Sequence, residues 1–276
     1  MSTDEIHDHD RGLSHDLPRI VEQGVARRRL LGLLGGVSAA AVLAACGSDD
    51  ETGSATVSTP SATTVDASAG EIPEETAGPF PGDGSNGANV LAQSGVVRSD
   101  IRSSFGGASG VAEGVPLTVR LKVYDLTGSE VQALSGAAVY VWHCNRAGEY
   151  SMYSADVADE NYLRGVQETD SSGLVEFTTI FPAAYDGRWP HIHFEVYPSV
   201  DDATSASNKL RTSQLALPED ICKQVYEADG YDASVGNLER VSLSTDMVFS
   251  DGYSLQMPTV TGSNDDGWVA TLNVPV

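Results

Sequence analysis

One stretch decides the fold of this 276-residue chain: Arg188-Trp189-Pro190-His191-Ile192-His193-Phe194-Glu195-Val196-Tyr197. Its last seven residues alternate, so that a β-strand would carry Ile192, Phe194 and Val196 on one face. His191 and His193 then share the other face, where both side chains can converge on one metal ion. Copper, zinc and iron sites all use such a pair, and two ordinary strand histidines would look the same, so the pair alone leaves the chemistry open.

Strand patterns recur along the rest of the chain. Alternating or short apolar runs bounded by turn residues predict further strands at residues 117–124, 138–143, 174–180, 210–216, 241–249 and 268–274. Only residues 218–228 carry a helical pattern, with Ile221 and Val225 on one side. Many short strands separated by Gly-rich turns predict an all-β fold, an antiparallel β-sandwich core with loops and a short helix.

The composition narrows the range of partners. The chain has 39 acidic and 16 basic side chains, a formal net charge of −23, which argues against nucleic acid because phosphate binding needs a basic face. Three cysteines are too few for a disulfide framework, and no C-x-x-C pair is present. Cys144 and Cys222 could pair outside the cytoplasm or stay as two separate buried thiols. The sequence decides neither this question nor whether the protein is a homo-oligomer.

The N-terminus has the features of an export signal. Arg27-Arg28-Arg29 precedes a weakly apolar stretch, residues 30–45, which suits a signal peptide better than a membrane-spanning helix. A twin-arginine pair before such a stretch is typical of Tat export. Leu43-Ala44-Ala45-Cys46 resembles a bacterial lipobox, in which Cys46 would become the lipid-bearing residue.

This pattern divides the chain into three parts. Residues 1–45 are predicted to be a Tat-type lipoprotein signal peptide, and residues 46–74 a flexible tether rich in Ser, Thr and Ala. Residues 75–276 are predicted to form the folded domain. The protein is therefore expected on the extracellular side of the cell envelope, in contact with the membrane only through an N-terminal lipid anchor.

Two tyrosines add a second kind of metal ligand. Tyr150 follows the strand predicted at residues 138–143, and Tyr185 lies in the loop before the histidine pair. Tyrosinate is a hard, strongly donating anion, which favours Fe(III) over Zn(II) or Fe(II). Each tyrosine by itself could equally be an ordinary loop aromatic. His143 is the one other histidine after residue 46, and a rival zinc or copper site would recruit it.

Longer motifs follow one another along residues 75–225. They are Glu75-Thr76-Ala77-Gly78-Pro79-Phe80, Arg98-Ser99-Asp100-Ile101-Arg102, Val141-Trp142-His143-Cys144-Asn145, Gly148-Glu149-Tyr150-Ser151, Arg164-Gly165, Gln167-Glu168-Thr169-Asp170, Phe177-Thr178-Thr179-Ile180-Phe181-Pro182, Arg188-Trp189-Pro190-His191-Ile192-His193 and Leu210-Arg211-Thr212-Ser213-Gln214. In this order they resemble the intradiol ring-cleavage dioxygenases, the family of catechol 1,2- and protocatechuate 3,4-dioxygenases. The resemblance implies a β-sandwich with its active site at one edge.

The resemblance also implies a metal and an activity. The family binds non-haem Fe(III) through two tyrosines and two histidines, which correspond here to Tyr150, Tyr185, His191 and His193. Its members use O2 to cleave the bond between the two hydroxylated carbons of a catecholic substrate, which gives a cis,cis-muconate-type diacid. By this resemblance Tyr185 leaves the metal and takes up a proton, whereas Tyr150 stays bound.

Further residues near the histidine pair correspond to family positions. Arg188 matches an arginine that stabilises negative charge on the bound catecholate, and Gln214 matches a glutamine beside the active site. Trp189 is interpreted either as a substrate contact or as a core aromatic. The chain departs from the family at Asn145, where many relatives carry Asp, and in the very short loop before the histidine pair. The usual substrate therefore need not carry over.

The sequence leaves two alternatives to an intradiol dioxygenase function. The first is a catalytically inactive β-sandwich that acts as a binding or adhesion module. The second is a zinc or copper enzyme that uses His143, His191 and His193. The complete set of family ligands argues against the first rival, and the identity of the bound metal distinguishes all three functions.

Overall fold

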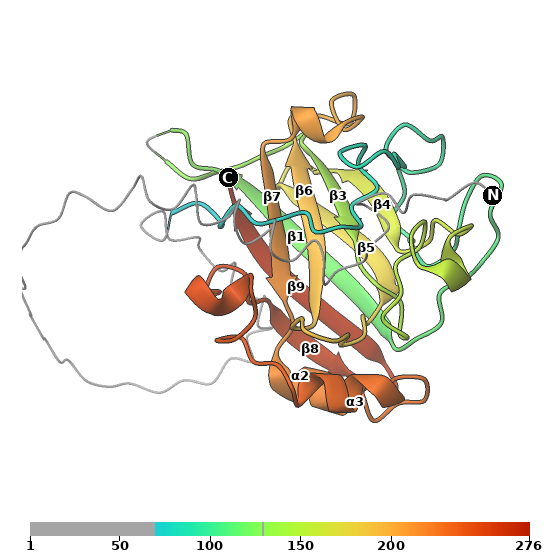
Figure 1. Cartoon of the computed structure of the whole chain (residues 1–276). Coiled ribbons are helices and arrows are strands. Elements are labelled where there is room, and N and C mark those ends of the chain that lie inside the picture. The colour runs from blue at the N-terminus through green and yellow to red at the C-terminus, as the bar shows by residue number, and fades with distance from the viewer. Residues whose placement is uncertain (1–69, 129) are drawn as a thin grey trace, which may run out of the picture.

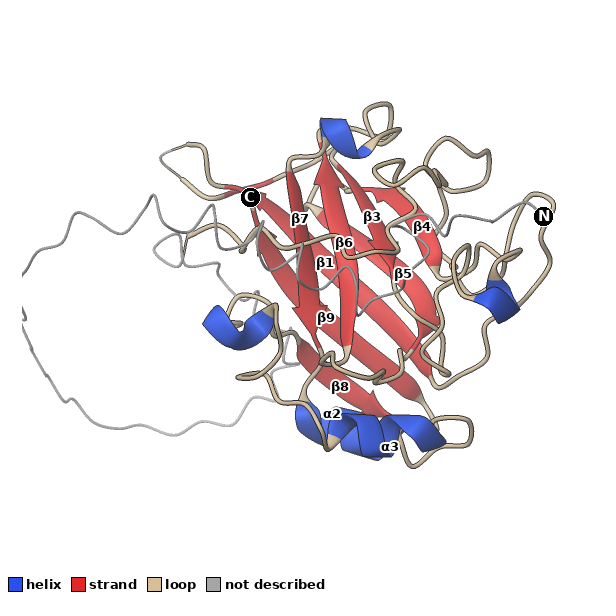
Figure 2. Ribbon diagram, in the orientation of Figure 1, coloured by secondary structure: helices blue, strands red, loops and turns tan. Residues whose placement is uncertain are grey.

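The computed structural model describes residues 70–128 and 130–276, which form two sheets stacked face to face (Figure 1). The strands are β1 (Pro116–Asp125), β2 (Gln132–Ala133), β3 (Ala138–Trp142), β4 (Arg164–Glu168), β5 (Leu174–Ile180), β6 (His191–Tyr197), β7 (Arg211–Ala216), β8 (Thr259–Ser263) and β9 (Gly267–Pro275). The helices are α2 (Glu219–Val225) and α3 (Asp232–Leu238), with short 3-10 helices η3 (Ala155–Val157), η4 (Ala206–Asn208) and η5 (Phe249–Asp251). Strands dominate the regular structure, and α2 and α3 lie together at one end of the sandwich (Figure 2).

The two sheets differ in strand direction. In the smaller sheet, β4, β3, β6 and β7 pair in that order, and every pair is antiparallel. In the larger sheet the order is β2-β1-β9-β8, with β5 also paired to β1, and the β1–β9 pair is parallel. The predicted all-β sandwich is confirmed, but it is not wholly antiparallel. Most of the domain separates β1 from β9 in sequence, so no tight hairpin dictates their relative direction.

The main core lies between the two sheets. Val119 of β1 and Ile192 and Phe194 of β6 point into it and are fully buried. Burial of each such side chain stabilises the fold by about 1.5 to 3 kcal/mol. Because Ile192 and Phe194 face this core, the alternation of the strand turns His191 and His193 to the opposite face of the smaller sheet.

That opposite face is buried as well. Tyr140 and Trp142 of β3 form a second core there with Val90 and Val96, which belong to the chain segment before β1. The His193 ring stacks on the indole of Trp142, with 4.8 Å between centroids and 7° between planes. The histidine pair therefore lies in an apolar layer beneath the segment before β1.

The folded part begins before Glu75, the predicted domain boundary. Ile72 is fully buried in the main core, and its backbone N–H donates to Pro275 O at 2.8 Å. The predicted signal peptide and the lipidation site at Cys46 lie outside the described residues, as does the tether up to residue 69. Within the part of the chain that is described, no helix has the length and apolar character needed to cross a membrane.

The strand predicted at residues 241–249 is wrong, because this stretch forms turns that lead into η5. The Asp246 side chain is the local reason. Its Oδ1 accepts hydrogen bonds from the backbone N–H groups of Val248 and Phe249, at 2.8 and 3.2 Å, which withdraws both groups from strand pairing.

Three strands and one α-helix of the described residues were not predicted, nor were the short 3-10 helices, whereas the other expected strands and the helix at 218–228 are confirmed. The missed strands are β2, β4 and β8, and the missed α-helix is α3. Helix α3 contains Gly, Ser, Asn and Asp, which are weak helix formers, so its sequence carries little helical signal. Strand β8 is largely exposed and lacks a buried face that would produce alternation.

Cys144 and Cys222 are both buried, free thiols. Cys144 belongs to the second core and Cys222 to the main core. The structure therefore contains the two separate thiols, and the alternative disulfide is wrong for it. Burial raises the pKa of Cys144 to about 12, which keeps this group protonated at neutral pH.

Candidate metal centre

Four polar atoms converge beside β6. His191 and His193 project from the strand, Tyr185 comes from the β5–β6 loop, and Tyr150 comes from the loop after β3. His191 Nε2 lies 3.0 Å from His193 Nε2, 3.2 Å from Tyr185 Oη and 3.5 Å from Tyr150 Oη. The two tyrosine Oη atoms are 3.3 Å apart. The structure thus brings together the four side chains predicted as metal ligands, and these four atoms are called the donor cluster below.

Both histidines are held as neutral imidazoles. Burial lowers the pKa of His191 well below its usual value, and the Arg188 cation lowers it further. Burial and the neighbouring His191 ring lower the pKa of His193 in the same way. His191 Nδ1 donates to Trp189 O at 2.5 Å, so its Nε2 carries the lone pair that faces the donor cluster.

The two tyrosines need a cation before they can ionise. Burial raises the pKa of Tyr150 well above its usual value, and the Tyr185 hydroxyl raises it further. Burial likewise raises the pKa of Tyr185 to about 12. Tyr150 is 2% exposed, whereas Tyr185 is only half-buried. Tyr185 is therefore the most exposed member of the donor cluster.

The spacing of the donor cluster fits a single metal ion. Ligand atoms about 2.1 Å from one ion, at angles of about 90 to 109°, lie about 3.0 to 3.4 Å from each other. The distances from His191 Nε2 to the other three atoms, and between the two tyrosine Oη atoms, run from 3.0 to 3.5 Å. Two neutral imidazoles and two phenol oxygens, once ionised, suit Fe(III) better than a softer or less charged ion. The residues present therefore fit non-haem iron.

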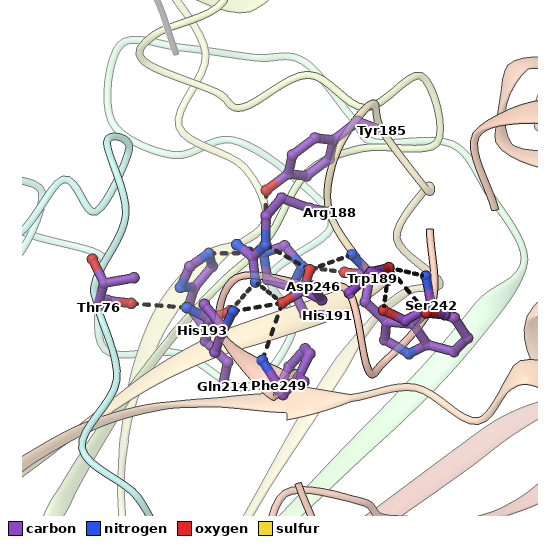
Figure 3. A network of polar contacts seen from close by, with 12 residues as sticks. Thr76, Tyr185, Arg188, Trp189, His191, His193, Gln214, Ser242, Asp246 and Phe249 are labelled. Atoms are coloured by element: carbon purple, nitrogen blue, oxygen red, sulfur yellow. Dashed lines mark hydrogen bonds and ion pairs between the residues drawn. The ribbon is translucent and has the colours of Figure 1, made fainter. Parts of the chain in front are cut away.

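Arg188 and Gln214 lie next to the donor cluster (Figure 3). Arg188 Nη1 is 3.4 Å from His191 Nε2, and Arg188 Nη2 donates to Gln214 Oε1 at 2.7 Å. Gln214 Nε2 in turn donates to Thr76 O at 2.8 Å. Arg188 is 6% exposed and Gln214 is fully buried, so a fixed cationic group faces the donor cluster.

Asp246 is a buried partner of this arginine that sequence analysis missed. Its Oδ2 accepts hydrogen bonds from Arg188 Nε at 2.9 Å and from Trp189 N at 2.7 Å (Figure 3). The carboxylate is fully buried. The one signal in the sequence was an acidic residue inside a stretch expected to be a strand, 58 residues after its partner.

Trp189 and His143 are buried structural residues and do not belong to the donor cluster. Trp189 packs in the main core, 2% exposed, and its indole N–H donates to Leu217 O at 2.9 Å, in keeping with the core interpretation. Both ring nitrogens of His143 are engaged, Nε2 with Thr179 Oγ1 at 2.7 Å and Nδ1 with Cys144 O at 2.8 Å. His143 therefore does not join the histidine pair. Within the described residues, no group of three or more His, Cys, Asp or Glu side chains could hold a metal.

The segment before β1 covers the donor cluster from one side. The Phe80 ring lies 5.1 Å from the Tyr150 ring, and a Cβ added at Gly78 would lie 3.4 Å from His193 Cε1. Arg164, 1% exposed, donates to Phe80 O at 2.9 Å and so ties this segment to the smaller sheet. The cluster is thus shielded on the side opposite the main core.

The fold and the donor cluster define a β-sandwich protein with a centre lined by tyrosine and histidine. Residues 99–220 match the protein-family model described as Dioxygenase. The matched region includes both tyrosines and both histidines of the donor cluster, Arg188 and Gln214. It ends before Asp246.

Two curated relatives are catechol 1,2-dioxygenases. That of Candida albicans is 37% identical over 109 residues, which are 33% of this chain and 36% of that protein. Catechol 1,2-dioxygenase 1 of Acinetobacter lwoffii is 36% identical over 61 residues, which are 22% of this chain and 20% of that protein. The chain therefore matches only about a third, or less, of the length of these relatives.

A solved structure is similar over a larger share of the chain. The intradiol ring-cleavage dioxygenase from Tetranychus urticae gives a TM-score of 0.53 at 25% identity, and the match covers 65% of this chain and 86% of that one. Two stacked sheets with two short helices agree with this fold. The chain is therefore similar to intradiol ring-cleavage dioxygenases over part of its sequence and in its fold.

Proposed function

We propose that the protein is a non-haem Fe(III) intradiol dioxygenase. It would use O2 to cleave the bond between the two hydroxylated carbons of a catecholic substrate, giving a cis,cis-muconate-type diacid. The observation that carries this proposal is the convergence of two phenol oxygens and two imidazoles within 3.5 Å, beside a buried arginine. The catechol 1,2-dioxygenase relatives support ring cleavage in general.

Tyr150, Tyr185, His191 and His193 would hold the iron. When bound, ferric iron supplies Lewis acidity that lowers the pKa of the catechol hydroxyls and withdraws electron density from the ring. The neutral histidines leave the charge of the site to be balanced by the two phenolates and the substrate. The apolar layer around His193 and Trp142 excludes water and so strengthens these interactions.

Tyr185 is suited to move a proton. It is the half-buried member of the donor cluster, so its ring can turn toward solvent, whereas Tyr150 is packed against Phe80. A phenolate with a pKa of about 12 is a strong base once it is released. Tyr185 Oη would therefore take up a proton from a substrate hydroxyl as the substrate binds.

Arg188 is suited to stabilise negative charge on the substrate. Its Nη1 edge faces the donor cluster, where the catechol oxygens would lie. Because Asp246 and Gln214 already hold the guanidinium, no reorganisation is needed when charge develops on the ring. The net charge of −23 disfavours carboxylated catechols, so we infer that neutral catechols are the better substrates.

Metal analysis combined with a visible spectrum tests the proposed function. The predicted mature chain, residues 46–276, should bind stoichiometric iron and show a red tyrosinate-to-Fe(III) band that shifts when catechol is added. Oxygen uptake should follow, with catechol turned over in preference to protocatechuate. Colourless protein that holds zinc or copper would favour the histidine-based enzyme. Failure to take up iron on reconstitution would leave the binding module as the better account.

We also propose that the enzyme is exported and lipid-anchored. The support is the twin-arginine stretch and the lipobox-like sequence that ends at Cys46, in the part of the chain before the described residues. Cells expressing the full chain should incorporate a labelled fatty acid into the protein. Cys46→Ala should lose the label, and Cys222→Ala, at a buried thiol, should keep it. Equal labelling of both variants would contradict the proposed anchor.

A further inference from the structure

We propose that Asp246 is a positioning residue that orients the Arg188 guanidinium toward the donor cluster. Asp246 comes from the turn before η5, beyond the region that matches the dioxygenase family model. It touches no atom of the donor cluster and would act only through Arg188. Its effect on turnover rests on the proposed function, whereas its effect on the geometry of Arg188 does not.

The hydrogen-bond partners of Arg188 fix the orientation of its guanidinium. A guanidinium is planar and has five N–H donors in a rigid fork. Arg188 Nε donates to Asp246 Oδ2 at 2.9 Å, and Nη2 donates to Gln214 Oε1 at 2.7 Å and lies 3.4 Å from Asp246 Oδ1. Two partners along one side of the fork fix both the plane and the rotation of the group. The Nη1 edge is then the part left to face the donor cluster.

The Asp246 side chain is itself held in one position. Its Oδ1 accepts from Val248 N and Phe249 N, and its Oδ2 accepts from Trp189 N as well as from Arg188. Both carboxylate oxygens are thus saturated by donors from two separate chain segments (Figure 3). A fully buried carboxylate with this many donors cannot rotate without leaving N–H groups unpaired. It therefore transmits a fixed position to the arginine.

Asp246 also balances the buried positive charge of Arg188. Arg188 is almost completely buried beside the donor cluster, and a buried cation without an anion is costly. Gln214 is neutral and supplies hydrogen bonding but no charge. Asp246 balances the guanidinium from the side away from the donor cluster, so the cation can stay in this apolar layer. Without that carboxylate, the guanidinium would turn toward whatever acceptor or water it could reach.

Asp246→Asn is the direct test. The amide keeps the shape of the side chain but places an NH2 group opposite N–H donors and removes the charge. We expect kcat to fall by about 10- to 100-fold, because misplacement of a catalytic group by about 1 Å has effects of that size. Iron content and the tyrosinate band should stay unchanged. Asp186→Asn is the matched control, since it removes an exposed carboxylate that pairs with Arg240 and lies in the β5–β6 loop, which also carries Arg188.

A double-mutant cycle separates positioning from general damage to the fold. If Asp246 acts through Arg188, adding Asp246→Asn to Arg188→Ala should change kcat by less than about twofold. An equal loss in both backgrounds would show that Asp246 acts independently of Arg188 and would overturn the inference. Wild-type kcat in the Asp246→Asn variant would overturn it as well.

A measurement on the metal-free full chain does not depend on the proposed function. In a 1H–15N spectrum, the Nε–H signal of Arg188, assigned by its loss in Arg188→Lys, should exchange slowly with solvent in the wild type and lose this protection in Asp246→Asn. An unchanged signal would overturn the inference even if the protein proved not to be a dioxygenase. If Asp246→Asn fails to fold, Asp246→Ala removes the carboxylate without placing an NH2 among the donors, and the same comparison decides.

Discussion

Arg188→Ala is expected to lower kcat by about 10²- to 10³-fold while the protein still binds iron. Arg188 is not a member of the donor cluster, and its Nη1 lies 3.4 Å from His191 Nε2. The substitution therefore removes a fixed positive charge but none of the four ligands. KM should change less than kcat, because the charge is needed mainly where negative charge develops on the ring. Steady-state oxygen uptake and metal analysis check both parts.

The same substitution leaves Asp246 buried without its cation. Breaking a buried ion pair by removal of one partner costs about 3 to 5 kcal/mol, so the free energy of unfolding should fall by about that amount. Arg120→Ala is the matched control, because Arg120 is an exposed arginine of β1 that pairs with Glu176 on the surface. A kcat close to that of the wild type in the Arg188→Ala variant would contradict the role proposed for this residue.

Tyr150→Phe is expected to remove the tyrosinate colour or the iron itself. The substitution removes one buried oxygen from a cluster in which every other donor atom lies within 3.5 Å of His191 Nε2. The phenylalanine side chain has no atom that can bind a metal ion. Iron affinity should fall by more than about 100-fold, the upper end of losses seen when only an outer hydrogen-bond partner of a metal ligand is removed. Titration with iron, followed by the visible band, measures this loss.

Tyr124→Phe is the control for this experiment, since it removes a hydroxyl from β1 in the other sheet. It should keep both the iron and the band. An unchanged spectrum in Tyr150→Phe would take Tyr150 out of the ligand set and leave Tyr185 as the source of any tyrosinate colour.

The sequence by itself determined the strands that carry the site. Period-two alternation reports which face of a strand is buried, and this property is local. The pattern of β6 therefore placed Ile192 and Phe194 in the main core and the histidine pair on the opposite face, as the structure has them. The order of the family motifs identified the two tyrosines, Arg188 and Gln214 as residues that belong to one site.

Only the tertiary structure decided what surrounds that site. The pattern of residues 241–249 suggested a strand, but the Asp246 carboxylate takes up the backbone N–H groups of Val248 and Phe249 and holds Arg188 instead. The residues of helix α3 have weak intrinsic helix propensity, so this helix depends on the packing of its buried residues. Cys144 and Cys222 are separate thiols that lie in two different cores. Contacts between segments far apart in sequence, such as the pair of Arg188 and Asp246, leave no local period from which they could be inferred.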